Sequence, residues 1–94
     1  MSDFPVRDNP AEHRFELLVE GAVGALASYR VRDGVVDIRH TETAPEMQGR
    51  GLASELARQT LDQLRERGAR VVASCPFFAR YINEHPEYAD LLAH

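Results

Sequence analysis

The chain has 94 residues, an ordinary globular composition and a net charge of -4, which argues against a protein whose main work is gripping nucleic acid. That length predicts a single domain over residues 1–94, with room for one sheet and one or two helices. One cysteine excludes an internal disulfide framework. The start has no basic region before an apolar run, and no apolar stretch approaches the roughly 20 residues of a membrane span. We therefore expect a cytoplasmic protein with no membrane partner.

The first half of the chain is typical of an antiparallel meander of about three strands. Residues 1–13 are polar and are expected to form a lead-in with at most a short edge segment. The predicted strands cover 15–19, 23–32 and 35–43. Asp33-Gly34, between the last two, is a strong signal for a two-residue hairpin turn. Alternation along the third strand would place Val36, Ile38 and His40 on one face of the sheet.

A change from strand to helix periodicity marks the second half. Pro45 ends the third strand because it lacks the N–H that a strand ladder needs. A long helix follows, and Gly68 is well placed as the residue just past its end. The apolar positions of this helix are Leu52, Ala53, Leu56, Ala57, Leu61 and Leu64. Residues 69–74 are apolar and β-branched, so we predict a buried fourth strand, parallel to the third because the helical crossover between them is right-handed.

Short helices complete the predicted fold. Pro76 suits the first position of a helix that stops before Pro86, and residues 88–92 would form a last amphipathic turn. The elements together predict an α+β fold (α/β-like in its second half): a meander, a glycine loop, a long helix, a parallel fourth strand and short C-terminal helices.

The segment 48–53, where the third strand leads into the long helix, is a candidate anion site. A helix N-terminus offers unpaired N–H groups and about half a positive charge, and Gly49 and Gly51 would let a phosphate come close. Gln48 can donate through its amide and Arg50 through its guanidinium. The chain has no lysine for a Walker loop and lacks the third glycine of a dinucleotide fingerprint. A tight turn that binds no ligand is the alternative, and the loop alone leaves both open.

This loop and three further motifs resemble a known family. Gln48-x-x-Gly51-x-Ala53 is similar to the pyrophosphate loop of the Gcn5-related N-acetyltransferases, the GNAT family. His40-Thr41-Glu42-Thr43 resembles the His-Thr-Glu-Val of the family's very small, single-domain branch, with threonine in place of the usual valine. Cys75-Pro76-Phe77 and His85-Pro86-Glu87-Tyr88 resemble that branch as well. The similarity covers roughly residues 14–92.

The resemblance implies a minimal GNAT fold that binds coenzyme A or acetyl-coenzyme A as a substrate, without a metal. The pyrophosphate would rest on the amides of residues 48–53. The pantetheine arm would pair with the backbone of residues 42–44, in a gap between two splayed parallel strands. The implied binding residues are Glu42, Thr43, Ala44, Met47, Gln48, Gly49, Arg50, Gly51, Leu52 and Ala53, with Cys75, Phe78 and Tyr81 toward the thioester. The N-terminal helical segment that shapes the amine groove of full-size members is expected to be missing.

Three residues are candidates for the chemistry. Cys75 follows a buried strand and precedes a helix, where the thiolate is favoured, so it is either an acyl-accepting nucleophile or a small buried hydrophobe. Glu42 either takes a proton from an incoming ammonium or is an exposed strand glutamate. His40 is either a base or a hydrogen-bonded structural histidine. The aromatic stripe that includes Phe78 and Tyr81 is more typical of a core than of a channel lining.

Two functions remain open from the sequence. The first is an N-acyltransferase that moves an acetyl group from acetyl-coenzyme A to an amine, through Cys75 or by direct attack assisted by Glu42. The alternative is a non-catalytic module that holds coenzyme A or acyl-coenzyme A. The acceptor could be a protein lysine, a polyamine or a small metabolite, and we expect a monomer or weak dimer. The spacing of the histidines, the cysteine and the carboxylates does not suggest a metal site.

Overall fold

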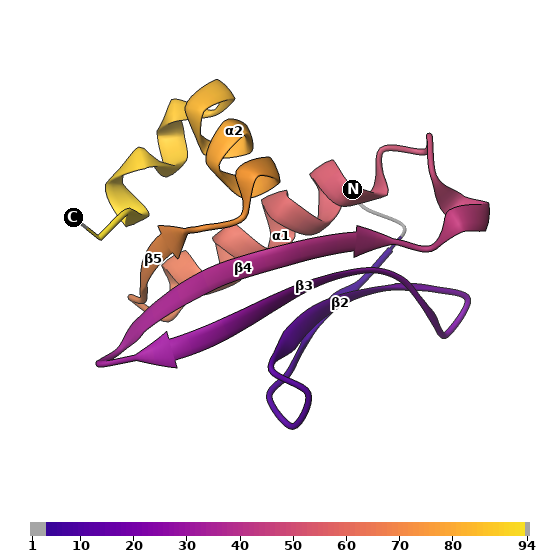
Figure 1. Ribbon diagram of the computed structural model, residues 1–94, viewed down its shortest axis with the longest axis horizontal. Helices are drawn as coiled ribbons and strands as arrows, with labels where there is room; N and C mark the ends of the chain where they lie inside the picture. Colours follow the sequence, from indigo (N-terminus) through magenta and orange to yellow (C-terminus); the bar gives the residue numbers. More distant parts are fainter. Residues whose placement is uncertain (1–3, 94) are drawn as a thin grey trace.

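The computed structural model describes residues 4–93 and shows one five-stranded sheet with its helices on one face (Figure 1). The strands are β1 (Val6–Asn9), β2 (Arg14–Val19), β3 (Ala22–Arg32), β4 (Val35–Thr43) and β5 (Arg70–Ala73). They follow one another in chain order across the sheet; β1 to β4 are antiparallel, and β5 is parallel to β4. The α+β fold and the parallel final strand are confirmed.

The meander has four strands rather than the three expected, because part of the polar lead-in forms β1. Val6 turns inward and is 8% exposed, opposite Leu17 of β2. Arg7 and Asn9 turn outward and hydrogen-bond the carboxylate of Glu16. A four-residue strand with a single apolar inward position carries too little periodicity to be recognised as a strand from the sequence. Residues 1–3 of the lead-in lie outside the described residues.

The helical elements begin and end close to where the sequence signals lie. They are η1 (Pro45–Met47), α1 (Leu52–Glu66), α2 (Pro76–Glu84) and η2 (Pro86–Leu91). Gly68 adopts φ 70° after α1, where its N–H donates to the Arg65 carbonyl and the N–H of Ala69 donates to that of Leu64. This pair of bonds is the Schellman ending that a glycine at this position predicts. None of the helices among residues 4–93 is long and apolar enough to cross a membrane.

The core lies between the sheet and the two α-helices. Its fully buried large side chains include Phe15, Leu17, Ile38, Leu56, Leu61, Leu64, Val71 and Phe78. Burial of each side chain of this size contributes roughly 1.5–3 kcal/mol relative to leaving it in water. The predicted apolar face of α1 supplies the helical side of this core, so its orientation over the sheet follows from its 3.6-residue periodicity.

The two strands of the β3–β4 hairpin are joined as the sequence predicts. Asp33 and Gly34 both adopt positive φ, 51° and 79°. Those values match a two-residue turn whose twist suits a right-handed hairpin. Further along the hairpin the register shifts: Tyr29 pairs with Ile38 but Ser28 pairs with His40. Residue 39 is therefore an extra residue on β4, which makes a β-bulge.

The bulge changes which side chains of β4 face the helices. Before it, Val36 and Ile38 are buried in the core. After it, Thr41 and Thr43 are the partly buried positions, and His40 is exposed. The prediction that His40 shares a face with Val36 and Ile38 is therefore wrong. One inserted residue shifts a period-two alternation by one position, and only the pairing with β3 reveals it.

Candidate functional site

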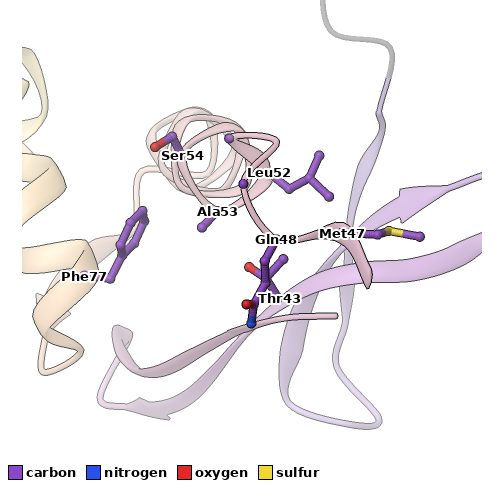
Figure 2. Close-up of a pocket in the computed structure, with 9 residues that line it drawn as sticks. Thr43, Met47, Gln48, Leu52, Ala53, Ser54 and Phe77 are labelled. Carbon is purple, nitrogen blue, oxygen red and sulfur yellow. The ribbon is translucent and has the colours of Figure 1, made fainter. Parts of the chain in front are cut away.

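A cavity of about 360 Å³ opens where the end of β4, the glycine loop, the start of α1 and α2 meet (Figure 2). It is lined by Thr43, Met47, Gln48, Gly49, Gly51, Leu52, Ala53, Ser54 and Phe77. Figure 2 shows Phe77 of α2 across from Ala53, with Thr43 and Gln48 below, while the Met47 side chain points away. The cavity brings together most of the predicted loop residues and one strand residue, Thr43.

The start of α1 gives this cavity its donors. Gly51 is the N-cap residue and no side chain caps the helix, so the first amides, from Leu52 to Ser54, retain the unpaired N–H groups of a helix terminus. Gly49 and Gly51 adopt φ of 85° and 74°, a region that other residues rarely enter. A Cβ at either position would meet no protein atom within 4 Å. Backbone conformation, rather than crowding inside the chain, therefore requires glycine here, and the cradle stays open to a ligand.

The charge around the cradle suits an anion. None of the cavity-lining residues carries a formal charge. Arg50 is exposed in the loop and makes no salt bridge with any residue of 4–93. The acidic residue of the first helical turn, Glu55, is paired with Arg58 instead. A phosphate at the start of α1 would thus meet helix amides and one guanidinium, and none of the residues that line the cavity is a carboxylate.

Gly24 of β3 holds the loop against the sheet, a role that sequence reasoning missed. It is the extra residue of a bulge against β2, and its carbonyl accepts a 2.8 Å hydrogen bond from the Ala44 N–H. A Cβ at Gly24 would lie 2.9 Å from Met47 Sδ and from Val19 Cγ2, and 3.5 Å from Leu52 Cδ1. The side chains at both ends of the loop therefore seat on this glycine. An isolated glycine inside a strand is the available signal for such a close approach.

The strands β4 and β5 separate beside the cavity. Their pairing ends at Ile38 and Ala73, and the Cys75 N–H then donates 2.8 Å to the Ile38 carbonyl before α2 begins. Residues 39–43 continue β4 with β3 as their strand neighbour. The sheet therefore opens on the β5 side of β4, as the resemblance implied.

The backbone at this opening has a definite polarity. The Ala44 N–H is directed toward β3, where it bonds Gly24. Because successive N–H groups of a strand point to opposite sides, the amide of Thr43 points into the opening. Of the residues 42–44 expected to pair with a pantetheine arm, Thr43 thus presents its amide to the gap, and that of Ala44 is already used.

Cys75 sits at the closed end of the opening. It is the N-cap residue of α2, is 4% exposed, and its Sγ lies 3.2 Å from Thr41 Oγ1. It is a free thiol. Pro76 occupies the first helical position, as predicted. The bulge in β4 brings Thr41, which the sequence did not single out, to this thiol.

His40 and Glu42 form a pair on the other face of the sheet. His40 Nε2 lies 3.4 Å from Glu42 Oε2, and both side chains are 63% exposed. Alternation along β4 places them opposite Thr41, which contacts Cys75. His40 and Glu42 therefore share a face of the sheet, and the thickness of the sheet separates them from Cys75.

Comparison with known proteins agrees with this geometry. The family model of the GCN5-related N-acetyl-transferases matches residues 14–91, most of the chain. The chain belongs to the GCN5-related N-acetyltransferase family. The loop, the splayed strands and the flanking motifs are thus explained together by one fold, as the resemblance predicted.

Individual members of the family extend the comparison. Protein NATD1 of Gallus gallus is 32% identical over 83 residues, which is 88% of this chain and 67% of that protein. Protein NATD1 of Homo sapiens is 32% identical over the same share of this chain and 66% of that protein. The solution NMR structure of a GCN5-like protein from Staphylococcus aureus matches with a TM-score of 0.71 at 25% identity, over 99% of this chain and 91% of that chain. The chain spans about two thirds of the NATD1 relatives, so that comparison bears on the shared domain.

The aromatic residues of α2 divide between core and cavity in this GNAT domain. Phe78 is fully buried and Tyr81 is 7% exposed, and burial raises the pKa of Tyr81 above its ordinary value. Phe77, which the sequence did not assign to binding, lines the cavity, as does Ser54. Adjacent helical residues point about 100° apart, so Phe77 and Phe78 serve different surfaces. Coenzyme contacts by Phe78 and Tyr81 stay a prediction.

Metal binding finds no support in the described part of this GNAT domain. Among residues 4–93, no group of three or more histidine, cysteine, aspartate or glutamate side chains is placed to hold an ion. His85, the histidine next to Pro86, uses Nδ1 to contact the Tyr81 carbonyl at 2.9 Å and stacks on the Tyr81 ring. Its role is packing at the end of α2.

Proposed function

We propose that the chain is an acetyl-coenzyme A-dependent N-acyltransferase that moves an acetyl group to an amine. The observation that carries the proposal is the place of the cavity. It lies between the uncapped N-terminus of α1 and Thr43 of β4, beyond the point where β4 stops pairing with β5, and Cys75 lies where that pairing ends. Acetyl-coenzyme A supplies the activated thioester, and the chain's own residues bind and orient it.

Binding uses fixed backbone groups. The amides from Leu52 to Ser54 and the Arg50 guanidinium would hold the pyrophosphate, because an uncapped helix start and a nearby cation both favour negative charge. The Thr43 amide would orient the pantetheine arm along β4. Phe77 would cover the arm from α2. Donors held by secondary structure lose little freedom on binding, which favours a productive orientation.

Two routes to the acceptor follow from the two faces of β4. In the covalent route, the Cys75 thiolate attacks the acetyl carbonyl, the bond to the coenzyme sulfur breaks, and the departing thiolate takes a proton. The acceptor amine then attacks the acetyl-cysteine and regenerates the thiol. In the direct route, Glu42 takes a proton from the incoming ammonium on the exposed face, beside His40. The free amine then attacks the acetyl carbonyl, the bond to the coenzyme sulfur breaks, and the departing thiolate takes the second proton of the amine. The acceptor itself is proposed only as an amine: a protein lysine, a polyamine or a small metabolite.

Calorimetry with a thiol-release assay tests the proposal. We expect wild-type protein to bind acetyl-coenzyme A and to release free thiol in the presence of a suitable amine from a broad panel. Gly51→Glu should reduce the affinity at least about 100-fold, because it adds a carboxylate at the anion site and strains a residue at positive φ. Gly34→Glu is the matched control, since Gly34 has φ 79° in a remote hairpin turn with open space around it. Equal affinities in the two variants would contradict the assignment of the loop.

Intact-mass measurement separates the two routes. Protein incubated with acetyl-coenzyme A should gain one acetyl group in the covalent route, and Cys75→Ala should neither gain it nor turn over. A fully active Cys75→Ala enzyme would rule that route out. Glu42→Gln would then be expected to lose most of the activity.

A non-catalytic coenzyme A-binding module is the second candidate. The observation that favours it is the burial of Cys75, which is only 4% exposed behind Thr41. Tight binding of acetyl-coenzyme A with no thiol release above the hydrolysis background, across the whole amine panel, would support the module over the enzyme.

A further inference from the structure

Among residues 4–93, the side chain that hydrogen-bonds the Cys75 sulfur is Thr41, whose Oγ1 lies 3.2 Å from Sγ. The contact joins β4 to the N-terminus of α2, two elements that are 34 residues apart in sequence. A second contact between the same segments, from the Cys75 N–H to the Ile38 carbonyl, fixes the backbone of the cysteine. The thiol is therefore held from both its backbone and its side chain.

The bulge in β4 makes this contact possible. Without the extra residue 39, alternation from Val36 and Ile38 would bring His40 to the inward face and turn Thr41 outward. The structure thus places a neutral hydroxyl, rather than an imidazole, beside the sulfur.

Among residues 4–93, no ionisable side chain makes a hydrogen bond or ion pair with the Cys75 sulfur, whose side-chain partner is the neutral Thr41 hydroxyl. A hydroxyl and a thiol can each donate in the neutral state, but a thiolate can only accept. Donation from Thr41 Oγ1 therefore strengthens when the sulfur carries charge.

We infer that Thr41 is a positioning residue that donates its hydroxyl hydrogen to the Cys75 thiolate and so makes this buried sulfur reactive. The inference rests on the covalent route of the proposed function for its biological use. The reactivity itself belongs to the protein without any acyl donor, so it is measured separately from turnover.

Alkylation by iodoacetamide in the absence of acetyl-coenzyme A tests the inference, since Cys75 is the chain's one thiol. Thr41→Val removes the hydroxyl at nearly constant volume, and Thr41→Ser keeps it. At neutral pH we expect the alkylation rate to fall about tenfold in Thr41→Val, the equivalent of one hydrogen bond to a charged group, and to stay within about twofold of wild type in Thr41→Ser.

Two controls separate this effect from a change in folding. Thr60→Val deletes a hydroxyl that makes no hydrogen bond to the thiol, and it should alkylate like wild type. Circular dichroism and thermal melting should show Thr41→Val folded. The inference is overturned if Thr41→Val alkylates as fast as wild type at neutral pH, which would mean that the thiol donates to Oγ1. It is equally overturned if Thr41→Ser alkylates as slowly as Thr41→Val, which would mean that the hydroxyl is not the cause. Loss of turnover with these alkylation rates intact would count against the proposed function alone.

Discussion

The two halves of β4 show how one strand serves both the core and the site. From Val35 to Ile38 the strand has neighbours on both sides, β3 and β5, and its inward side chains are buried. From residue 40 onward it keeps β3 but has parted from β5, and its inward side chains are threonines. The bulge at residue 39 separates the halves and reverses their faces. The backbone hydrogen-bonding groups of a strand become available to a ligand where the strand loses a neighbour, so the opening in the sheet lies beside the candidate site.

Ile38→Ala, in the first half of β4, should have the largest effect on the stability of the protein. Ile38 is fully buried, and deleting its side chain leaves a cavity that the surrounding core fills only in part. We expect the free energy of unfolding to fall by about 3 kcal/mol, measured by urea denaturation. Thr43→Val, in the second half, should change stability by less than about 0.5 kcal/mol, and coenzyme A binding measured by calorimetry should change little because the proposed contact is the Thr43 backbone amide. Similar stability losses in both variants would show that the two halves of β4 contribute equally to stability.

Gly24→Ala extends the comparison to β3, the strand that pairs with both halves of β4. Its Cβ would lie 2.9 Å from Met47 Sδ and from Val19 Cγ2, so the loop must shift away from the sheet. We expect a loss of about 1–3 kcal/mol in stability, with clearly weaker coenzyme A binding. Gly21→Ala, at φ 83° with open space around it, controls for backbone strain and should leave binding unchanged. Unchanged binding in Gly24→Ala would show that coenzyme A binding does not depend on the packing of the loop against Gly24.

Glu16→Gln tests the outer face of the sheet at β2, where other side chains of the chain bury and hydrogen-bond the Glu16 carboxylate. Burial raises the pKa of the Glu16 carboxyl, but hydrogen bonds from Arg14, Arg7 and Asn9 outweigh burial, and the pKa lies below its ordinary value. A lowered folded-state pKa stabilises the protein above the unfolded pKa of about 4.3, and that stability is lost as pH falls through the folded value. We expect Glu16→Gln to cost about 1–2 kcal/mol at pH 7.

The same variant should differ less from wild type at lower pH. Below the folded-state pKa both side chains are neutral, so the difference between their free energies of unfolding should shrink. Urea titrations at several pH values measure it, and a difference independent of pH would refute the role of the ionised carboxylate.

Thr60→Val should have the smallest effect and the opposite sign. Thr60 is fully buried in α1, and its Oγ1 has no hydrogen-bond partner among residues 4–93. Valine keeps the shape and removes the unsatisfied polar atom, so we expect a gain of about 1 kcal/mol in urea denaturation. Coenzyme A affinity should not change. A loss of stability would indicate that the hydroxyl is satisfied by a bound water.

Most of the fold was predictable because its signals are local. The Asp33-Gly34 turn, the apolar face of α1, its glycine ending and Pro76 at the start of α2 each depend on a few adjacent residues. The β1 strand was expected only as a possible short edge segment, because the three polar residues that follow Val6 in it carry little pattern. The loop was predicted to be an anion cradle, and anion binding there stays a prediction. The structure attributes its glycines to positive φ rather than to crowding inside the chain.

The sequence by itself therefore determined the order of the elements, the loop at the start of α1 and the family resemblance. Tertiary structure alone decided which side chains meet. The bulges at Gly24 and at residue 39 arise from pairing between strands. The isolated glycine in β3 is a signal for the first, but no property of β4 alone reveals the second. They place Thr41 against Cys75, turn His40 and Glu42 to the other face, and seat the loop on β3. Side-chain alternation propagates any shift in register along the whole strand, so one inserted residue reassigned every candidate beyond it.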